Sequence, residues 1–207
     1  MDIEKTLLLL MYILVSVLLI WAAVSDWKTR LIPRISGLGL LTIGFVYLLY
    51  GHNYAVAGYY LIMIIYSGLK HNGTFVQLFV ILLSILVLLD PTKNNDYIFG
   101  MLFTIFMYKY GVFGGGDSKI ALALLAIGQD WTMLYYIFLP NIIIAFILII
   151  KNQGVSGLSK RIIRVFNNFR TKNKPSEGDT EAIWFPWAVI AAPAALVYFW
   201  IYPGTVY

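Results

Sequence analysis

The sequence has no cysteine and very little charge. Of its 207 residues, 12% are charged and 60% are apolar. The absence of cysteine excludes disulfide bonds and thiolate metal sites. A soluble domain of this length has too little interior to bury so much apolar surface, so the composition predicts an integral membrane protein.

Histidine is also scarce. His52 and His71 are the two histidines, and they lie 19 residues apart in different predicted loops. A metal site built on them is not expected, and we expect neither a metal nor another cofactor. Nothing in the sequence indicates a nucleic-acid partner.

Long apolar segments account for most of the chain, and they predict an all-α, polytopic transmembrane bundle with about six to eight membrane segments in one domain, residues 1–207. The first segment is too long for a signal-peptide core, so we expect it to be a retained span. Several others are short for a bilayer, and 117–128 is expected not to cross completely. The segments are 6–24, 35–50, 54–69, 75–89, 96–111, 117–128, 130–150 and 185–202.

The basic residues are distributed unequally between the two sides that this topology defines. With the N-terminus outside, thirteen lysines and arginines fall on one side and only Lys5 and Lys93 on the other. The positive-inside rule makes the basic side cytoplasmic. Asp26 and Asp117 both belong to that side, because four crossings, an even number, separate them.

The segment 151–184 is a hydrophilic, basic stretch on the same side. Leu158, Ile162, Val165, Phe166 and Phe169 follow helical spacing, with cations on the other faces. This pattern predicts an amphipathic helix on the cytoplasmic leaflet, with anionic membrane lipids as partners. An ordinary basic loop is the alternative.

Asp26 and Asp117 are candidate catalytic residues. An acid near the bilayer interior is costly and indicates function. Two neighbouring carboxylates share a proton, so that one can activate water while the other polarises a peptide carbonyl. The glycines before Asp117, Gly114, Gly115 and Gly116, are expected to let a substrate backbone approach closely.

Each acid also has a structural interpretation. Asp26 alone is compatible with a water-exposed acid at a helix end. Asp117 is compatible with an N-cap for a helix from Ser118 to Ile127. Lys119 is a supporting residue that either pairs with Asp117 or extends to the interface.

The run from Gly114 to Lys119 resembles the GxGDxK signature of the type IV prepilin peptidases and archaeal preflagellin peptidases, which are GxGD membrane aspartyl proteases. Asp26, followed by Arg30 and Ile32-Pro33, resembles the first catalytic aspartate of that family. Phe185-Pro186-Trp187-Ala188 resembles the entry to its last helix.

The resemblance implies an aspartic endopeptidase that removes a short basic leader from pilin-like or flagellin precursors at the cytoplasmic face of the cell membrane. It implies Asp26 and Asp117 as the catalytic pair. Bacterial members usually carry a cysteine-based zinc domain and N-methylate the product. This chain has no cysteine and no candidate methyl-donor site, so it resembles the archaeal type that is only a peptidase.

The chain also departs from that family. Four spans separate the acids here, whereas the family usually has about two, and residues 70–96 resemble an extra membrane hairpin. Two other functions remain open. One is a presenilin or signal-peptide-peptidase relative, faintly echoed by Pro193-Ala194-Ala195-Leu196. The other is a small proton-coupled transporter, although neither internal repeats nor acids near the midplane are found.

Overall fold

The computed structural model describes residues 3–29, 31–68, 74–88, 97–109, 114–130, 132–171 and 187–201. Within these ranges the chain forms helices and no strands, which confirms the predicted all-α class. The helices are α1 (Ile3–Thr29), α2 (Arg34–Tyr50), α3 (Tyr54–Gly68), α4 (Thr74–Leu88), α5 (Tyr97–Lys109), α6 (Gly115–Gly128), α7 (Met133–Thr171) and α8 (Trp187–Ile201).

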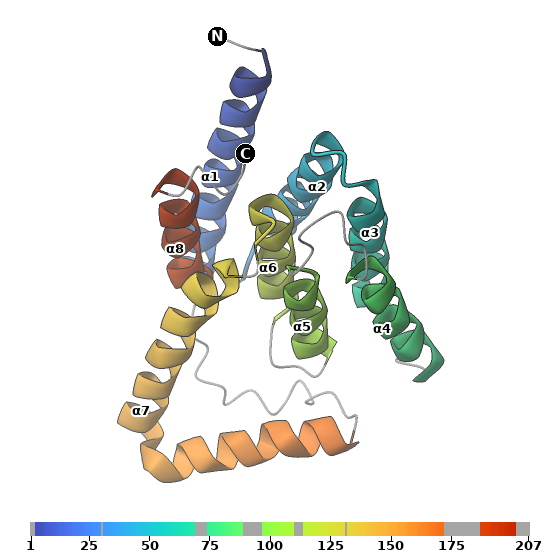
Figure 1. Ribbon diagram of the computed structural model, residues 1–207. Coiled ribbons are helices and arrows are strands. Elements are labelled where there is room, and N and C mark those ends of the chain that lie inside the picture. The colour runs from blue at the N-terminus through green and yellow to red at the C-terminus, as the bar shows by residue number, and fades with distance from the viewer. Residues whose placement is uncertain are drawn as a thin grey trace.

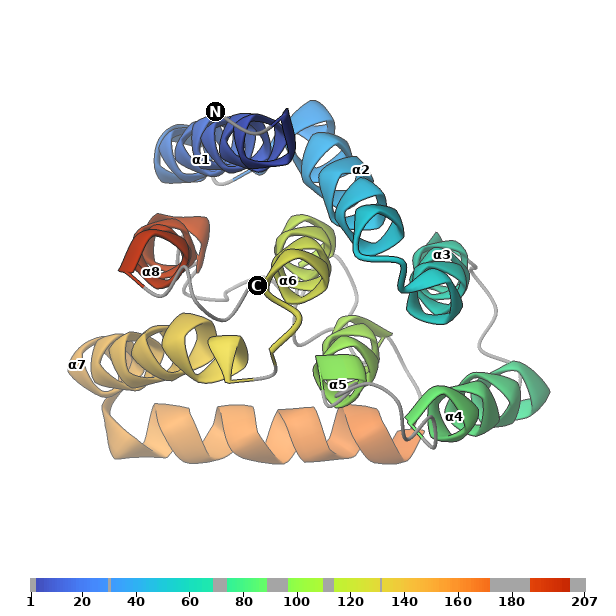
Figure 2. The same cartoon turned by 45° about the horizontal axis from the view of Figure 1, so that its top comes forward.

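Helix α6 is the centre of the bundle. Its residues from Ile120 to Gly128 are all buried, as expected for a helix that is apolar on every face. Figure 2 shows α6 with α2, α5, α7 and α8 around it. Its 14 residues extend about 21 Å at 1.5 Å per residue, less than the roughly 30 Å of a bilayer core. The neighbouring helices therefore shield this short helix.

Small residues bring α2 and α6 close together. A Cβ atom placed on Gly44 would lie 3.0 Å from the Cβ of Ala126 and 3.2 Å from the carbonyl oxygen of Ala123. Contacts this short leave room only for hydrogen at Gly44. This packing fixes α6 against the helix that directly follows the α1–α2 connection.

Helix α8 packs beside α1 (Figure 1). Its buried alanines lie at helical spacing and form one stripe, and small residues of this kind allow neighbouring helices to approach. The indole N–H of Trp200 donates to Ser16 Oγ at 3.4 Å, and the Tyr12 and Phe199 rings lie 5.8 Å apart. The stripe consists of Ala188, Ala191, Ala192 and Ala195.

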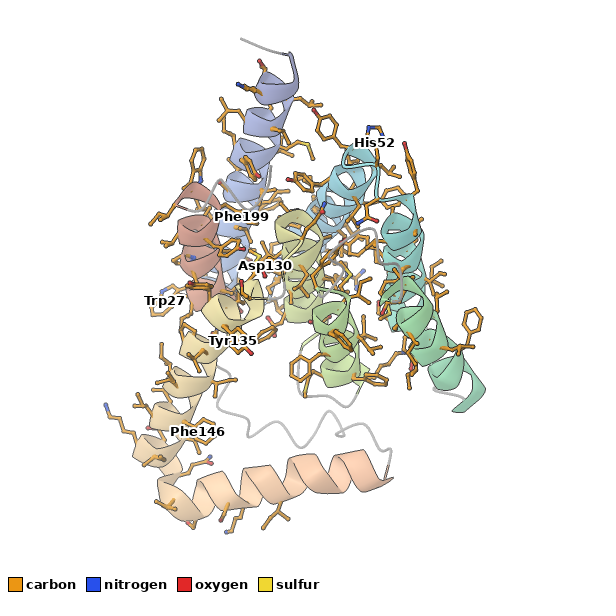
Figure 3. All side chains as sticks on the ribbon, viewed as in Figure 1. Trp27, His52, Asp130, Tyr135, Phe146 and Phe199 are labelled. Atoms are coloured by element: carbon orange, nitrogen blue, oxygen red, sulfur yellow. The ribbon has the colours of Figure 1, made fainter. Side chains whose placement is uncertain are left out.

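Asp130, just before α7, holds the C-terminal part of α8. Its carboxylate accepts hydrogen bonds from the Thr132 backbone and side chain and, at 2.7 Å, from the Tyr198 hydroxyl. Burial opposes ionisation of Asp130, but these hydrogen bonds outweigh it and hold the pKa of Asp130 below its usual value. Figure 3 shows Asp130 at the start of α7, next to α8.

Helix α7 bends at Gly154, whose φ of 69° and ψ of −178° are not helical. Beyond the bend it runs across the lower end of the bundle in Figure 1. The predicted amphipathic segment is therefore helical, but it continues directly from the preceding apolar segment, which was predicted to end at residue 150. Most of its side chains, and residues 172–184, lie outside the described residues.

Two of the described helical stretches are long and apolar enough to cross a membrane. They are Lys5–Thr29 and Tyr135–Gly157, with only 22% and 18% of their most apolar windows buried. This low burial differs from that of the core helix of a soluble protein, because large apolar side chains such as Leu14 and Ile147 face outward. Other apolar helices are shorter, so the count of six to eight crossings stays a prediction.

The stretch 70–96, predicted to be an extra hairpin, is described only at residues 74–88. These residues form α4, at the edge of the bundle. The Tyr59 hydroxyl and Ser84 Oγ lie 2.8 Å apart and connect α3 to α4. The rest of the stretch, including His71, lies outside the described residues, so the hairpin stays a prediction.

Candidate active site

Asp26 lies in the last turn of α1 and is 7% exposed. The backbone N–H of Ala188, in the first turn of α8, donates to Asp26 Oδ2 at 3.0 Å. The interpretation of Asp26 as a water-exposed acid at a helix end is therefore wrong. The predicted first segment ended at Val24, whereas α1 continues to Thr29, and this extra turn faces Asp26 toward the protein interior.

Hydrogen bonds at the end of α1 determine the path of the chain after Asp26. Ser25 Oγ donates to the Leu31 carbonyl oxygen at 2.9 Å, and Thr29 Oγ1 donates to that of Ser25 at 2.9 Å. Pro33 then precedes the first residue of α2, where a fixed φ suits the start of a helix. These contacts hold the short connection, including Ile32, next to the active-site end of the bundle.

Asp117 is the third residue of α6, because the helix begins at Gly115. Its Oδ2 accepts a hydrogen bond from the backbone N–H of Gly114 at 3.2 Å, and Ser118 N donates to the Gly114 carbonyl oxygen at 3.1 Å. Asp117 thus caps the helix from inside its first turn. The predicted N-cap position is wrong, since Gly114 occupies it.

The two acids lie at the same end of the bundle. Asp26 and Asp117 are 91 positions apart in the sequence, yet their carboxyl groups are close enough to interact electrostatically. Helix α2, packed on both α1 and α6, connects the elements that carry them. Asp26 is buried and Asp117 is partly buried, and two such acids are suited to holding and transferring a proton.

The three glycines have different surroundings. A Cβ on Gly116 would lie 2.7 Å from the Cβ of Ile32, so Gly116 is needed for contact with the α1–α2 connection. A Cβ on Gly115 would meet Tyr108 at an ordinary 3.6 Å. Gly114 and Gly115 are exposed. Backbone approach by a substrate stays a prediction, and the two exposed glycines have the open surface for it.

Lys119 packs its side-chain stem on α2. A Cβ on Gly37 would lie 3.3 Å from Lys119 Cδ. The structure has no ion pair between Lys119 and Asp117, both of which it describes. Lys119 therefore packs between α6 and α2, one helical turn from Gly116.

The donor to Asp26 was missed by sequence reasoning. Its backbone N–H is independent of side-chain type, so Ala188 carries no chemical signal of its own. The signal in the sequence was the position of Ala188, because Phe185-Pro186-Trp187-Ala188 resembles the entry to the last helix of the peptidase family. Phe185 and Pro186 lie outside the described residues.

Side chains at the site suit acid–base chemistry. Among the described residues there is no group of three or more histidine, cysteine or acidic side chains that could hold a metal ion. The two carboxyl groups can share one proton, which leaves one as a base and the other as an acid.

Comparison with known families gives one match. The type IV leader peptidase family matches residues 13–150, a range that contains both Asp26 and Asp117 and ends before α8. No curated protein and no solved structure matches the chain.

Proposed function

Because the chain belongs to the type IV leader peptidase family, we propose that it is a membrane aspartyl endopeptidase with Asp26 and Asp117 as its catalytic pair. The observation that carries this proposal is that the two carboxyl groups, which come from distant parts of the sequence, lie at one end of the bundle and within range of electrostatic interaction. Buried acids are expensive, and pairing them is useful when the chemistry needs both protonation states.

In the proposed reaction, the ionised carboxylate takes a proton from water, and the oxygen of that water attacks the scissile carbonyl. The neutral acid donates a hydrogen bond to the carbonyl oxygen. Collapse of the tetrahedral intermediate breaks the C–N bond, and the amine leaves with a proton supplied by the pair. The products are a carboxylic acid and an amine, and the pair then holds one proton again.

The proposed substrates are the precursors of type IV pilin-like proteins or archaeal flagellins, cut after their short basic leader. Exposed Gly114 and Gly115 provide backbone surface beside Asp117 where the chain around the scissile bond can lie. The absence of cysteine and of a candidate methyl-donor site favours a peptidase without N-methyltransferase activity.

The proposed location is the cell membrane, with multiple crossings and both acids on the cytoplasmic side. The positive-inside bias supports this orientation. The bend at Gly154 supports a second role for the basic half of α7, because it turns the helix away from its membrane-crossing direction. We expect this half to lie on anionic lipid head groups.

The test is cleavage of pilin-like and flagellin precursors by membranes that contain the protein. Asp26→Asn and Asp117→Asn should each abolish cleavage, because an amide can neither take nor supply the proton, while the variants still insert into the membrane. Lys119→Ala is the control, with a milder loss. Full cleavage by either asparagine variant would exclude the two-aspartate mechanism.

A further inference from the structure

The first turn of α8 presents backbone donors to Asp26. The first N–H groups of any helix have no acceptor within the helix, and the N-terminus carries a partial positive charge. In α8 one of these groups, the N–H of Ala188, donates to Asp26 Oδ2 at 3.0 Å. The donor and acceptor are 162 positions apart, so the bond depends on how α8 docks onto α1.

Docking of α8 is fixed along its whole length. Helix α8 packs on α1, where Ala22 lies one turn before Asp26 and is fully buried. Trp200 bonds to Ser16 near the other end, and Tyr198 bonds to Asp130. The position of the Ala188 N–H is therefore set by the bundle and does not depend on the Asp26 side chain.

Asp117 also accepts one backbone N–H, but under different conditions. Its donor, Gly114, is exposed, and water competes with such a bond. The bond to Asp26 involves two buried residues, where a hydrogen bond to a charged group is stronger. The buried Ala188 N–H therefore stabilises a charged carboxylate more than the exposed Gly114 N–H does.

We propose that α8 is a positioning element of the active site, in which the Ala188 N–H orients Asp26 and holds it as the ionised member of the pair. This inference rests on the proposed function. Asp26 is then the base that takes the proton from water, and Asp117 is the acid that donates to the scissile carbonyl and supplies the proton to the leaving amine.

Among the described residues, the charged groups that the helix ends bring to this end of the bundle include Lys28 on α1, Arg34 on α2, Lys109 on α5, and Asp117 and Lys119 on α6. Helix α8 contains no charged residue, and its one tyrosine, Tyr198, is at the other end. The charge that α8 supplies to Asp26 is therefore that of its backbone.

Proline substitution tests the role of this N–H. A proline is tolerated in the first turn of a helix, because the missing N–H has no partner within the helix. Ala188→Pro removes the donor to Asp26. Val189→Pro is the matched control, since it makes the same backbone change one residue later. Ala188→Gly retains the N–H and should behave like the unmodified protein.

The readout is the pH dependence of kcat for precursor cleavage. For Ala188→Pro we expect the acidic limb to move to higher pH by about one unit, the effect of losing a hydrogen bond to a charged group. We also expect kcat at neutral pH to fall about tenfold, because the Asp26 carboxylate is no longer oriented. Val189→Pro should retain the limb of the unmodified protein. KM should change little in both variants.

An unshifted acidic limb in Ala188→Pro, or an equal shift in Val189→Pro, would overturn the inference. If Ala188→Pro does not insert, replacement of residue 188 by lactic acid deletes the same N–H without the proline ring, and the same shift is required. Asp26→Asn is measured in parallel. Cleavage by Asp26→Asn would reject the proposed function itself, whereas an inactive Asp26→Asn with an unshifted Ala188→Pro would reject only the role of α8.

Discussion

Gly116 shows how a single residue connects the two halves of the site. Ile32 follows Asp26 by six positions, and Gly116 precedes Asp117 directly. The Cβ and Cδ1 atoms of Ile32 lie 2.7 Å and 2.9 Å from the place where a Cβ on Gly116 would be. The contact therefore holds the connection after α1 directly against the first turn of α6.

We predict that Gly116→Ala separates these two elements. The new methyl group overlaps the branch point of Ile32, which is close to the backbone and cannot rotate away, so the backbone must shift. Overpacking of this kind costs about 1–3 kcal/mol. Precursor cleavage should fall at least about tenfold, and the unfolding temperature in detergent should also fall.

Gly115→Ala is the matched control for this change. Its methyl group would meet Tyr108 at 3.6 Å, an ordinary contact, so stability should be retained. Equal loss of stability in both variants would contradict the role given to Ile32. A selective increase of KM in Gly115→Ala, with stability unchanged, would instead support substrate approach at the exposed glycines.

For single residues, the sequence indicated which side chains could take part in the chemistry, but it gave no information about which backbone N–H groups do. Asp26 and Asp117 could be chosen because carboxyl groups are rare in the chain and costly in a membrane. Ala188 could not be chosen, since any residue except proline provides the same N–H. The burial of Asp26 was also missed, because it depends on the docking of α8.

Among the helices, α7 combines two segments of different character. Its apolar first part and basic second part meet at Gly154, whose φ and ψ values lie in a region open almost only to glycine. A side chain there would be strained even though no atom lies within 4 Å of its Cβ position. The bend is therefore set by the backbone of one glycine.

Gly154→Ala is predicted to straighten α7 or move its bend, because the bent form then costs about 1–3 kcal/mol. The chain has no cysteine, so spin labels can be placed at Ile147→Cys and Ile163→Cys, both exposed sites. In Gly154→Ala the label distance should lengthen toward the roughly 24 Å rise of a straight 16-residue stretch.

Val155→Ala, an exposed neighbour, is the control and should leave the distance distribution unchanged. The same distances in Gly154→Ala and in the unmodified background would show that the bend does not depend on glycine. Hydropathy alone placed a boundary near residue 150, where the composition changes. It could not show that the helix continues through this boundary, because backbone hydrogen bonding does not require apolar residues.

For the whole molecule, the helices were predictable because each long apolar run needs its backbone hydrogen bonds satisfied internally. The arrangement of these helices in space was not predictable from the sequence. The central place of α6 follows from Gly44, Ala123 and Ala126, whose small size matters only once the partner helix is known. That Asp26 and Asp117 lie at the same end of the bundle was expected from an even number of crossings, but that argument said nothing about the distance between them.

The unequal distribution of basic residues predicts how the protein is oriented in the intact membrane. Trp27, next to Asp26, is 65% exposed at the lower end of α1, and His52 lies at the upper end of α2 (Figure 3). Because lysines and arginines gather at the Trp27 end, the positive-inside rule predicts that this end is cytoplasmic. In intact cells an impermeant maleimide should label His52→Cys and leave Trp27→Cys unlabelled. In inside-out vesicles the labelling should reverse, and the unmodified chain should give no background. Labelling of Trp27→Cys from outside would place both acids on the outer face and exclude cleavage of leaders in the cytoplasm.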